Sequence, residues 1–436
     1  MAHQAYSIPW QTLVDNLKYK HCNPRDAGVT NLNLRKGNPS SQGKQFQYFT
    51  RGFARALSKY STIERKKYNP QPQAPQLDEP IISDTAVKRM ARTILRYKSD
   101  PAISSALGVD LNTVLPPHER DVRWFIQGSG LYEGDMNLVI SECCELTKAM
   151  LMYGEMDALF RICKHPDVYL QKYWDDRWYA NSYGYGLRRL VDAALRAYIF
   201  FNVIFLMPEL YDSPTREAFI EKEVKAGRTK LRKADFDYRL TAAYQHVVLW
   251  NTGVPFGLPR HDVHTHPHRE FFGIPRGMFV FEWGDCSEKH WKKERIGTKR
   301  LENLTKKEFN NVYVASNADI AVVDGLLRRK GLPTELILQV LEAAEYVPVG
   351  RTHIRDDPLH KVNAKELKKY LNYCWLLLIR FDMICKESGS WLDWETLVTE
   401  ALYTLFNLSG LRSKLKEVPP NDEDFRHRNS KRVFII

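Results

Sequence analysis

The chain has 436 residues, of which 44% are hydrophobic and 12% aromatic, and this composition excludes a chain that is disordered throughout. Its formal net charge of +12 favours loose contact with acidic surfaces but says nothing about the fold. The opening segment, MAHQAYSIPWQTLVDNLKYK, has no continuous apolar run, so no secretory signal is expected. The seven cysteines include no CxxC pair, which indicates reduced thiols in an intracellular protein, cytoplasmic or nuclear.

Residues 1–80 have the least globular composition of the chain. The stretch 69–80, NPQPQAPQLDEP, contains four prolines and is typical of an extended linker. Between 44 and 67 there are seven basic residues and a single acid, Glu64, and aromatic residues are interleaved as on nucleic-acid surfaces. We therefore predict a basic, Pro-rich flexible N-terminal arm with a short amphipathic helix around Phe53. The alternative is that this arm binds nucleic acid weakly.

Residues 81–250 are predicted to form a helical domain, because apolar residues recur at the i, i+3, i+4 and i+7 positions of a buried helix face. Ser83 or Asp84 is a suitable N-cap for its first helix. The most apolar run, 197–207, is about half as long as a membrane span requires. It is interpreted as a buried helix, and no membrane partner is expected. The arginines off the apolar stripe are expected to face solvent: Arg188, Arg189 and Arg196.

The composition changes after Trp250. From 251 to 314 the chain is rich in Gly, Pro, His and aromatic residues and shows no helical period, which predicts an irregular segment. Hydrophobic residues at 279–283 indicate one short strand within it.

This irregular segment contains the run HDVHTHPHRE at 261–270. If the run is extended, Asp262, His264 and His266 project from one face, with His268 next in the same register. A carboxylate and imidazoles suit Zn²⁺, Mn²⁺ or Fe²⁺, and a metal held in this way activates water for hydrolysis. The stretch GLPRHDVHTHP also resembles the D-x-H-x-H signature of amidohydrolase-type metal-dependent hydrolases, which implies a divalent metal cofactor.

Two observations favour a different interpretation of the histidine run. Hydrolases of that type use a barrel of alternating strands and helices, whereas the 170 residues after His266 carry mostly helical periodicity. The glycines and prolines before the run also break any strand there. Further ligands would have to come from His246, Asp285, His290, Asp356 or His360. We therefore favour a histidine- and proline-rich surface loop without a cofactor, and keep the metal-dependent hydrolase as the alternative.

Residues 315–418 are predicted to form a C-terminal helical module, followed by a tail at 419–436. Its first long helix begins near Pro333, which suits the first turn of a helix. The apolar residues of that helix are predicted to form a buried stripe: Leu336, Ile337, Val340, Leu341 and Ala344. A second helix is predicted from Asn363, and a third begins after Asp393, a plausible N-cap.

Two parts of this module resemble the F-box, a small helical unit that docks onto an adaptor of ubiquitin ligases. Leu332-Pro333-x-Glu335-Leu336 is similar to its opening helix, and Cys374-Trp375 to its later helix. The resemblance implies that adaptor binding uses these residues: Leu332, Pro333, Leu336 and Trp375. The region 331–389 as a whole resembles an uncharacterised family of filamentous-fungal proteins.

The sequence therefore predicts a mainly α protein with a multi-helical core, an irregular segment and few short strands. We interpret it as a non-enzymatic intracellular interaction protein with a protein partner, for which a ubiquitin-ligase adaptor is the specific hypothesis. The alternatives are a hydrolase using Asp262, His264 and His266, and a weak nucleic-acid binder.

Overall fold

The computed structural model describes residues 5–21, 30–98, 114–129, 136–173, 186–227, 233, 236–252, 254–255, 270–272, 274–275, 280–281, 317–343, 354, 356–406 and 408. The α-helices are α1 (Trp10–Asp15), α2 (Pro39–Arg65), α3 (Asp84–Lys98), α6 (Val122–Ser129), α7 (Met136–Tyr153), α8 (Met156–Lys164), α9 (Leu187–Phe205), α10 (Ser213–Lys225), α11 (Ala242–Thr252), α15 (Asn317–Arg329), α16 (Thr334–Ala343), α17 (Ala364–Glu387) and α18 (Trp394–Leu405). Short 3₁₀ helices are η1 (Pro117–Glu119), η2 (Leu170–Tyr173), η4 (Pro208–Leu210), η6 (Tyr238–Leu240) and η7 (Lys361–Asn363).

Strands are few and short among the described residues. They are β1 (Leu17–Lys20), β2 (Asn31–Leu34), β3 (Val254–Pro255), β4 (Glu270–Phe271), β5 (Ile274–Pro275) and β6 (Val280–Phe281). They pair two by two: β1 with β2 and β4 with β5 antiparallel, and β3 with β6 parallel. The predicted mainly α fold with few short strands is confirmed.

Helix α9 is the centre of the fold. It packs against α17, α11 and α18, and nearly every one of its side chains is buried. A helix that is apolar all round must be covered on all sides, and this confirms the buried helix predicted at 197–207. Within the described part of the chain, no helix is both long and apolar enough to cross a membrane.

An aromatic cluster joins segments that are far apart in the sequence. The Trp375 ring of α17 stacks on Tyr198 of α9, with ring centroids 5.1 Å apart, and meets Phe53 of α2 edge-on at 5.6 Å. Trp10 of α1 completes the cluster at 5.7 Å from Tyr198, whose hydroxyl accepts a hydrogen bond from the backbone N–H of Ala5. The core therefore begins close to the N-terminus.

Here the structure differs from the predicted flexible arm at 1–80. Its central part is the 27-residue helix α2, which starts at the Asn38 cap and buries one face against α17, α18 and α1. The Pro-rich stretch 69–80 is also anchored, because Arg161 contacts the backbone oxygen of Gln73 and the carboxylate of Glu79. The long-range contacts that hold this segment cannot be read from its local composition.

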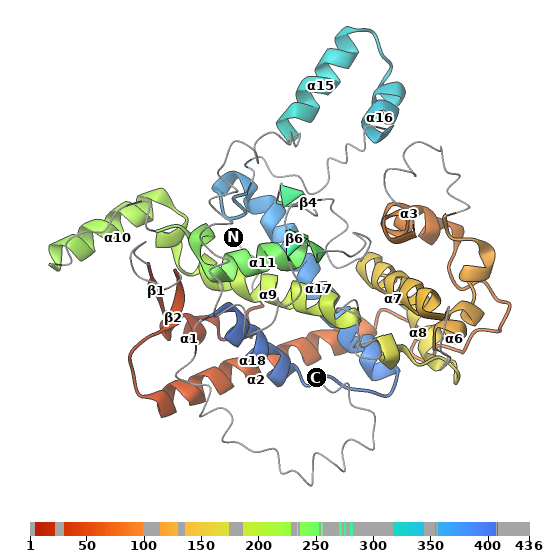
Figure 1. Ribbon diagram of the computed structural model, residues 1–436, viewed down its shortest axis with the longest axis horizontal. Coiled ribbons are helices and arrows are strands. Elements are labelled where there is room, and N and C mark those ends of the chain that lie inside the picture. The colour runs from red at the N-terminus through yellow and green to blue at the C-terminus, as the bar shows by residue number, and fades with distance from the viewer. Residues whose placement is uncertain are drawn as a thin grey trace.

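The other helices surround this centre (Figure 1). Helices α3, α6, α7 and α8 form a group on one side, in which α7 packs against the other three. Helices α17 and α18 belong to the predicted C-terminal module, yet they share one hydrophobic core with α2 and α9. Helix α10 and the α15–α16 pair extend from the body.

Candidate functional site

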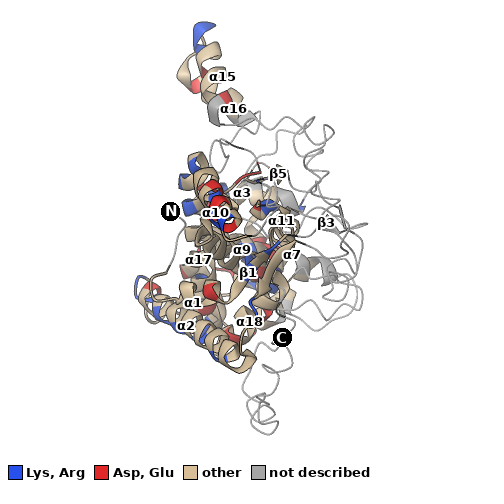
Figure 2. Cartoon of the chain, turned by 90° about the vertical axis from the view of Figure 1, so that its left-hand side faces the viewer, with Lys and Arg blue, Asp and Glu red and all other residues tan. Residues whose placement is uncertain are grey.

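The α15–α16 hairpin stands apart from the other described helices, as Figures 1 and 2 both show. Its two helices pack on each other, and Ile337 is fully buried but does not belong to the hydrophobic core of the body. Six branched apolar side chains on the hairpin are between 38% and 61% exposed: Val322, Val323, Leu326, Leu336, Leu338 and Val340. An exposed apolar surface of this kind is typical of an interaction site.

The turn of this hairpin is set by specific residues. Gly331 has φ of 82°, a left-handed conformation that favours glycine at the end of a helix. The Arg328 guanidinium donates to the Thr334 hydroxyl at 3.0 Å and pairs with the Asp324 carboxylate at 2.7 Å. These contacts join the end of α15 to the start of α16, so the two helices are held as a unit.

The structure separates the residues predicted to bind an adaptor. Pro333 and Leu336 are exposed on the hairpin, and Leu332 beside them is half-buried. Trp375 is only 4% exposed and lies inside the aromatic cluster of the core. The predicted stripe on α16 is also only partly buried, because Leu336 and Val340 face solvent.

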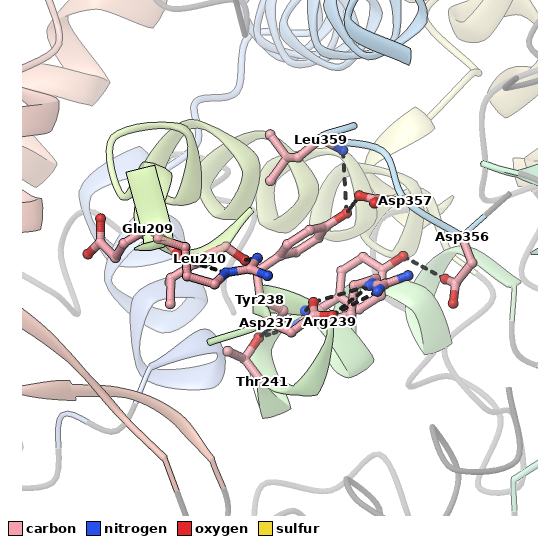
Figure 3. Close-up of polar contacts among 11 residues, drawn as sticks. Glu209, Leu210, Asp237, Tyr238, Arg239, Thr241, Asp356, Asp357 and Leu359 are labelled. Carbon is pink, nitrogen blue, oxygen red and sulfur yellow. Dashed lines mark hydrogen bonds and ion pairs between the residues drawn. The ribbon is translucent and has the colours of Figure 1, made fainter. Parts of the chain in front are cut away.

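A second polar feature joins α11 and η6 to the turn before α17 (Figure 3). The Tyr238 hydroxyl donates to the Asp357 carboxylate at 2.7 Å and accepts from the backbone N–H of Leu359 at 3.3 Å. The Tyr244 hydroxyl donates to Asp356 at 2.8 Å. Burial raises the pKa of both tyrosines well above 10, so their hydroxyls stay protonated and serve as donors.

Asp356 holds an unusual backbone conformation in this cluster. Its φ of 55° is left-handed, and its N–H donates to the Phe272 carbonyl oxygen at 2.9 Å. Burial raises the pKa of its carboxyl to about 6, although the hydrogen bond from Tyr244 and the positive charge of Arg239 oppose that rise. We had named Asp356 as one candidate metal ligand; it is instead engaged with a tyrosine. Sequence patterns gave no signal for the Tyr–Asp pairs.

A third polar feature corrects the prediction that three arginines of α9 face solvent. Arg189 and Arg196 are buried, and the Arg196 guanidinium lies 4.3 Å from the ring centroid of Trp250. Arg196 also donates to Asp192 at 3.1 Å and lies 2.8 Å from a ring nitrogen of His246. Burial, and then the charge of Arg196, lower the pKa of His246 well below 6.5, which keeps this histidine neutral. An arginine can therefore occupy an otherwise apolar helix face when a carboxylate and an aromatic ring receive it.

The histidine run at 261–270 falls almost wholly outside the described residues, so the metal ligands predicted there stay a prediction: Asp262, His264, His266 and His268. Within the part of the chain that the structure describes, no group of three or more His, Cys, Asp or Glu side chains is arranged to hold a metal ion.

Fold and surface together define a mainly helical protein with one aromatic-rich core and an exposed apolar hairpin. Residues 11–417 match the model of a protein family described as Gramillins biosynthetic cluster protein GRA5. The match spans most of the 436 residues, and the chain belongs to this family. Membership agrees with the predicted resemblance to filamentous-fungal proteins. No curated protein and no solved structure matches the chain significantly.

Proposed function

We propose that this chain is a non-catalytic interaction protein that binds another protein of a gramillins-type biosynthetic cluster through the α15–α16 hairpin. The observation that carries the proposal is the set of six exposed Val and Leu side chains on a unit that lies outside the core. The family description supports the biosynthetic setting, since it names a biosynthetic cluster and no reaction.

The hairpin gains stability if a partner covers it. Its helices have 13 and 10 residues, and isolated helices shorter than about 12–15 residues are marginal in water. Fully burying a Val or Leu side chain contributes about 1.5–3 kcal/mol, so covering six side chains that are about half exposed contributes roughly 5–9 kcal/mol. Association costs of at least about 4 kcal/mol offset much of this gain, which favours a reversible complex.

The partner that fits best is an amphipathic helix with acidic residues beside its apolar face. Val322, Val323 and Leu326 lie on one face of α15, the arrangement that receives a helix. At the tip, Arg328, Arg329 and Lys330 are exposed cations that would meet those acidic residues. The net charge of +12 disfavours a second copy of the chain as the partner.

The specific hypothesis of a ubiquitin-ligase adaptor remains part of this proposal. The F-box-like residues Leu332, Pro333 and Leu336 all lie on or beside the hairpin, so one surface serves both versions. Trp375 does not take part, because the core covers its ring.

The experiment is co-purification of the tagged chain with each protein encoded in its cluster and with a ubiquitin-ligase adaptor. The test variant combines Leu326→Lys with Leu336→Lys. The control is Leu77→Lys, since Leu77 and Leu326 are each 48% exposed and Leu77 lies in another segment. We expect one of these proteins to bind the wild type and the control variant, and to be lost from the double variant.

Three outcomes would contradict the proposal. The first is that none of these proteins binds, and the second is that the double variant retains the partner. The third is that light scattering shows a dimer of the wild-type chain which the double variant abolishes, because the hairpin would then bind a second copy.

A further inference from the structure

The outer face of α2 carries a row of cations. The exposed basic residues of this row are Lys44, Arg51, Arg55, Lys59 and Lys66, the last directly after the helix. At about 3.6 residues per turn they fall within an arc of about 80° around the helix axis. At about 1.5 Å per residue the row is about 33 Å long. It was part of the predicted basic arm, but the structure arranges it as a straight line on a rigid element.

The core holds this row in place. The opposite face of α2 buries Phe46, Phe49, Phe53 and Leu57, so the helix cannot turn its charged face away from solvent. A polyanion would therefore meet charges that are already arranged, and little backbone entropy would be lost on binding.

Neighbouring carboxylates neutralise only a small part of the row. Arg51 pairs with Glu395 of α18 at 3.5 Å, where both side chains are about half exposed and the pair is weak. The one acid of α2, Glu64, pairs with Lys67 away from the row. Helix α17 adds a further cation, Lys386, whose ammonium donates to the Ser58 hydroxyl at 3.1 Å although it also pairs with a buried aspartate.

We infer that this row binds the phosphate backbone of a nucleic acid. A narrow line of regularly spaced cations matches a linear polyanion. Tyr48 is 62% exposed and lies within the row between Lys44 and Arg51, where its ring is available to stack on a base. A lipid surface fits less well, because an interfacial helix inserts an apolar face and that of α2 is buried in the core. The site is separate from the hairpin and does not depend on the proposed partner.

The test is fluorescence anisotropy of the full-length chain with labelled single-stranded RNA, single-stranded DNA and duplex DNA, each about 30 nucleotides long, between about 50 and 200 mM salt. The test variant combines Arg51→Gln, Arg55→Gln and Lys59→Gln. The matched control combines Arg328→Gln, Arg329→Gln and Lys330→Gln, which removes the same charge from the hairpin tip. Circular dichroism checks that both variants keep the fold.

We expect the α2 variant to weaken binding about tenfold or more and to reduce the slope of log affinity against log salt by about 2–3, because three phosphate contacts are lost. The control variant should keep most of the affinity. Equal losses in both variants would show attraction by net charge alone and would overturn the inference. It is also overturned if no nucleic acid binds, or if phosphatidylserine vesicles or polyglutamate bind as tightly as the nucleic acids.

Discussion

Replacing Phe53 by alanine tests whether α2 belongs to the core. The Phe53 ring is fully buried and meets Trp10, Tyr198 and Trp375, with ring centroids 6.1, 6.2 and 5.6 Å away. Phe→Ala in a core costs about 3–5 kcal/mol, because apolar contact is lost and a cavity remains. Each edge-on aromatic pair adds about 0.5–1.5 kcal/mol, and three such pairs are lost. We therefore expect the free energy of unfolding to fall by about 5 kcal/mol.

The assay is urea unfolding followed by tryptophan fluorescence, because Trp10 and Trp375 both border the altered site. Tyr48→Ala is the control, since Tyr48 lies on the exposed face of the same helix and should change stability by less than about 0.5 kcal/mol. If the two variants unfold at the same urea concentration, α2 is not part of the core and the aromatic cluster does not stabilise the fold.

Other substitutions test the polar features and the histidine run. Because the folded-state pKa of Asp356 is raised from 3.8 to about 6, the folded protein binds that proton more tightly than the unfolded chain, and stability falls as pH rises from about 4 to about 6. Asp356→Asn tolerates the left-handed backbone and should be more stable than wild type at pH 7, by up to about 3 kcal/mol, with no such gain at pH 4; equal gains at both pH values in urea titrations would refute this. Arg196→Met leaves Asp192 without that charge partner and should cost about 3–5 kcal/mol in the same titrations, whereas a neutral result would mean that the pair contributes nothing. His264→Ala should change stability by less than about 0.5 kcal/mol if the run is a surface loop, and elemental analysis showing one metal equivalent that this variant loses would make the hydrolase the leading hypothesis.

Much of the helical core could be predicted because its signals are local. The apolar run at 197–207 predicted α9, and its all-round burial follows from its composition. The predicted cap at Asp393 is confirmed by its hydrogen bond from the Thr396 N–H at 3.1 Å. At the start of α3 the Ser83 hydroxyl accepts from the Ala86 N–H at 3.2 Å, as expected for one of the two candidate caps. Each of these signals lies within one turn or one face of a single helix.

Long-range contacts could not be predicted in the same way. Phe53 lies in a basic stretch beside a Pro-rich linker, and nothing near it indicates the Trp375 ring, more than 300 positions away, against which it packs. Arg196 shows the same limit, because it is the distant Trp250 and His246 that make its burial acceptable. A single sequence shows which side chains need partners, and only the tertiary structure shows where those partners lie.

The hairpin carries this reasoning one step further. Leu336 and Val340 follow the same spacing as the buried residues of α17 and α18, and the spacing predicts that they should be covered. They face solvent, although residues 317–343 lie inside the span that matches the family. An amphipathic period records a demand for apolar contact without saying which surface meets it. In α17 and α18 the body of the protein meets that demand. In α16 it is met only by Ile337 against α15, and a partner protein is the surface that would meet the rest.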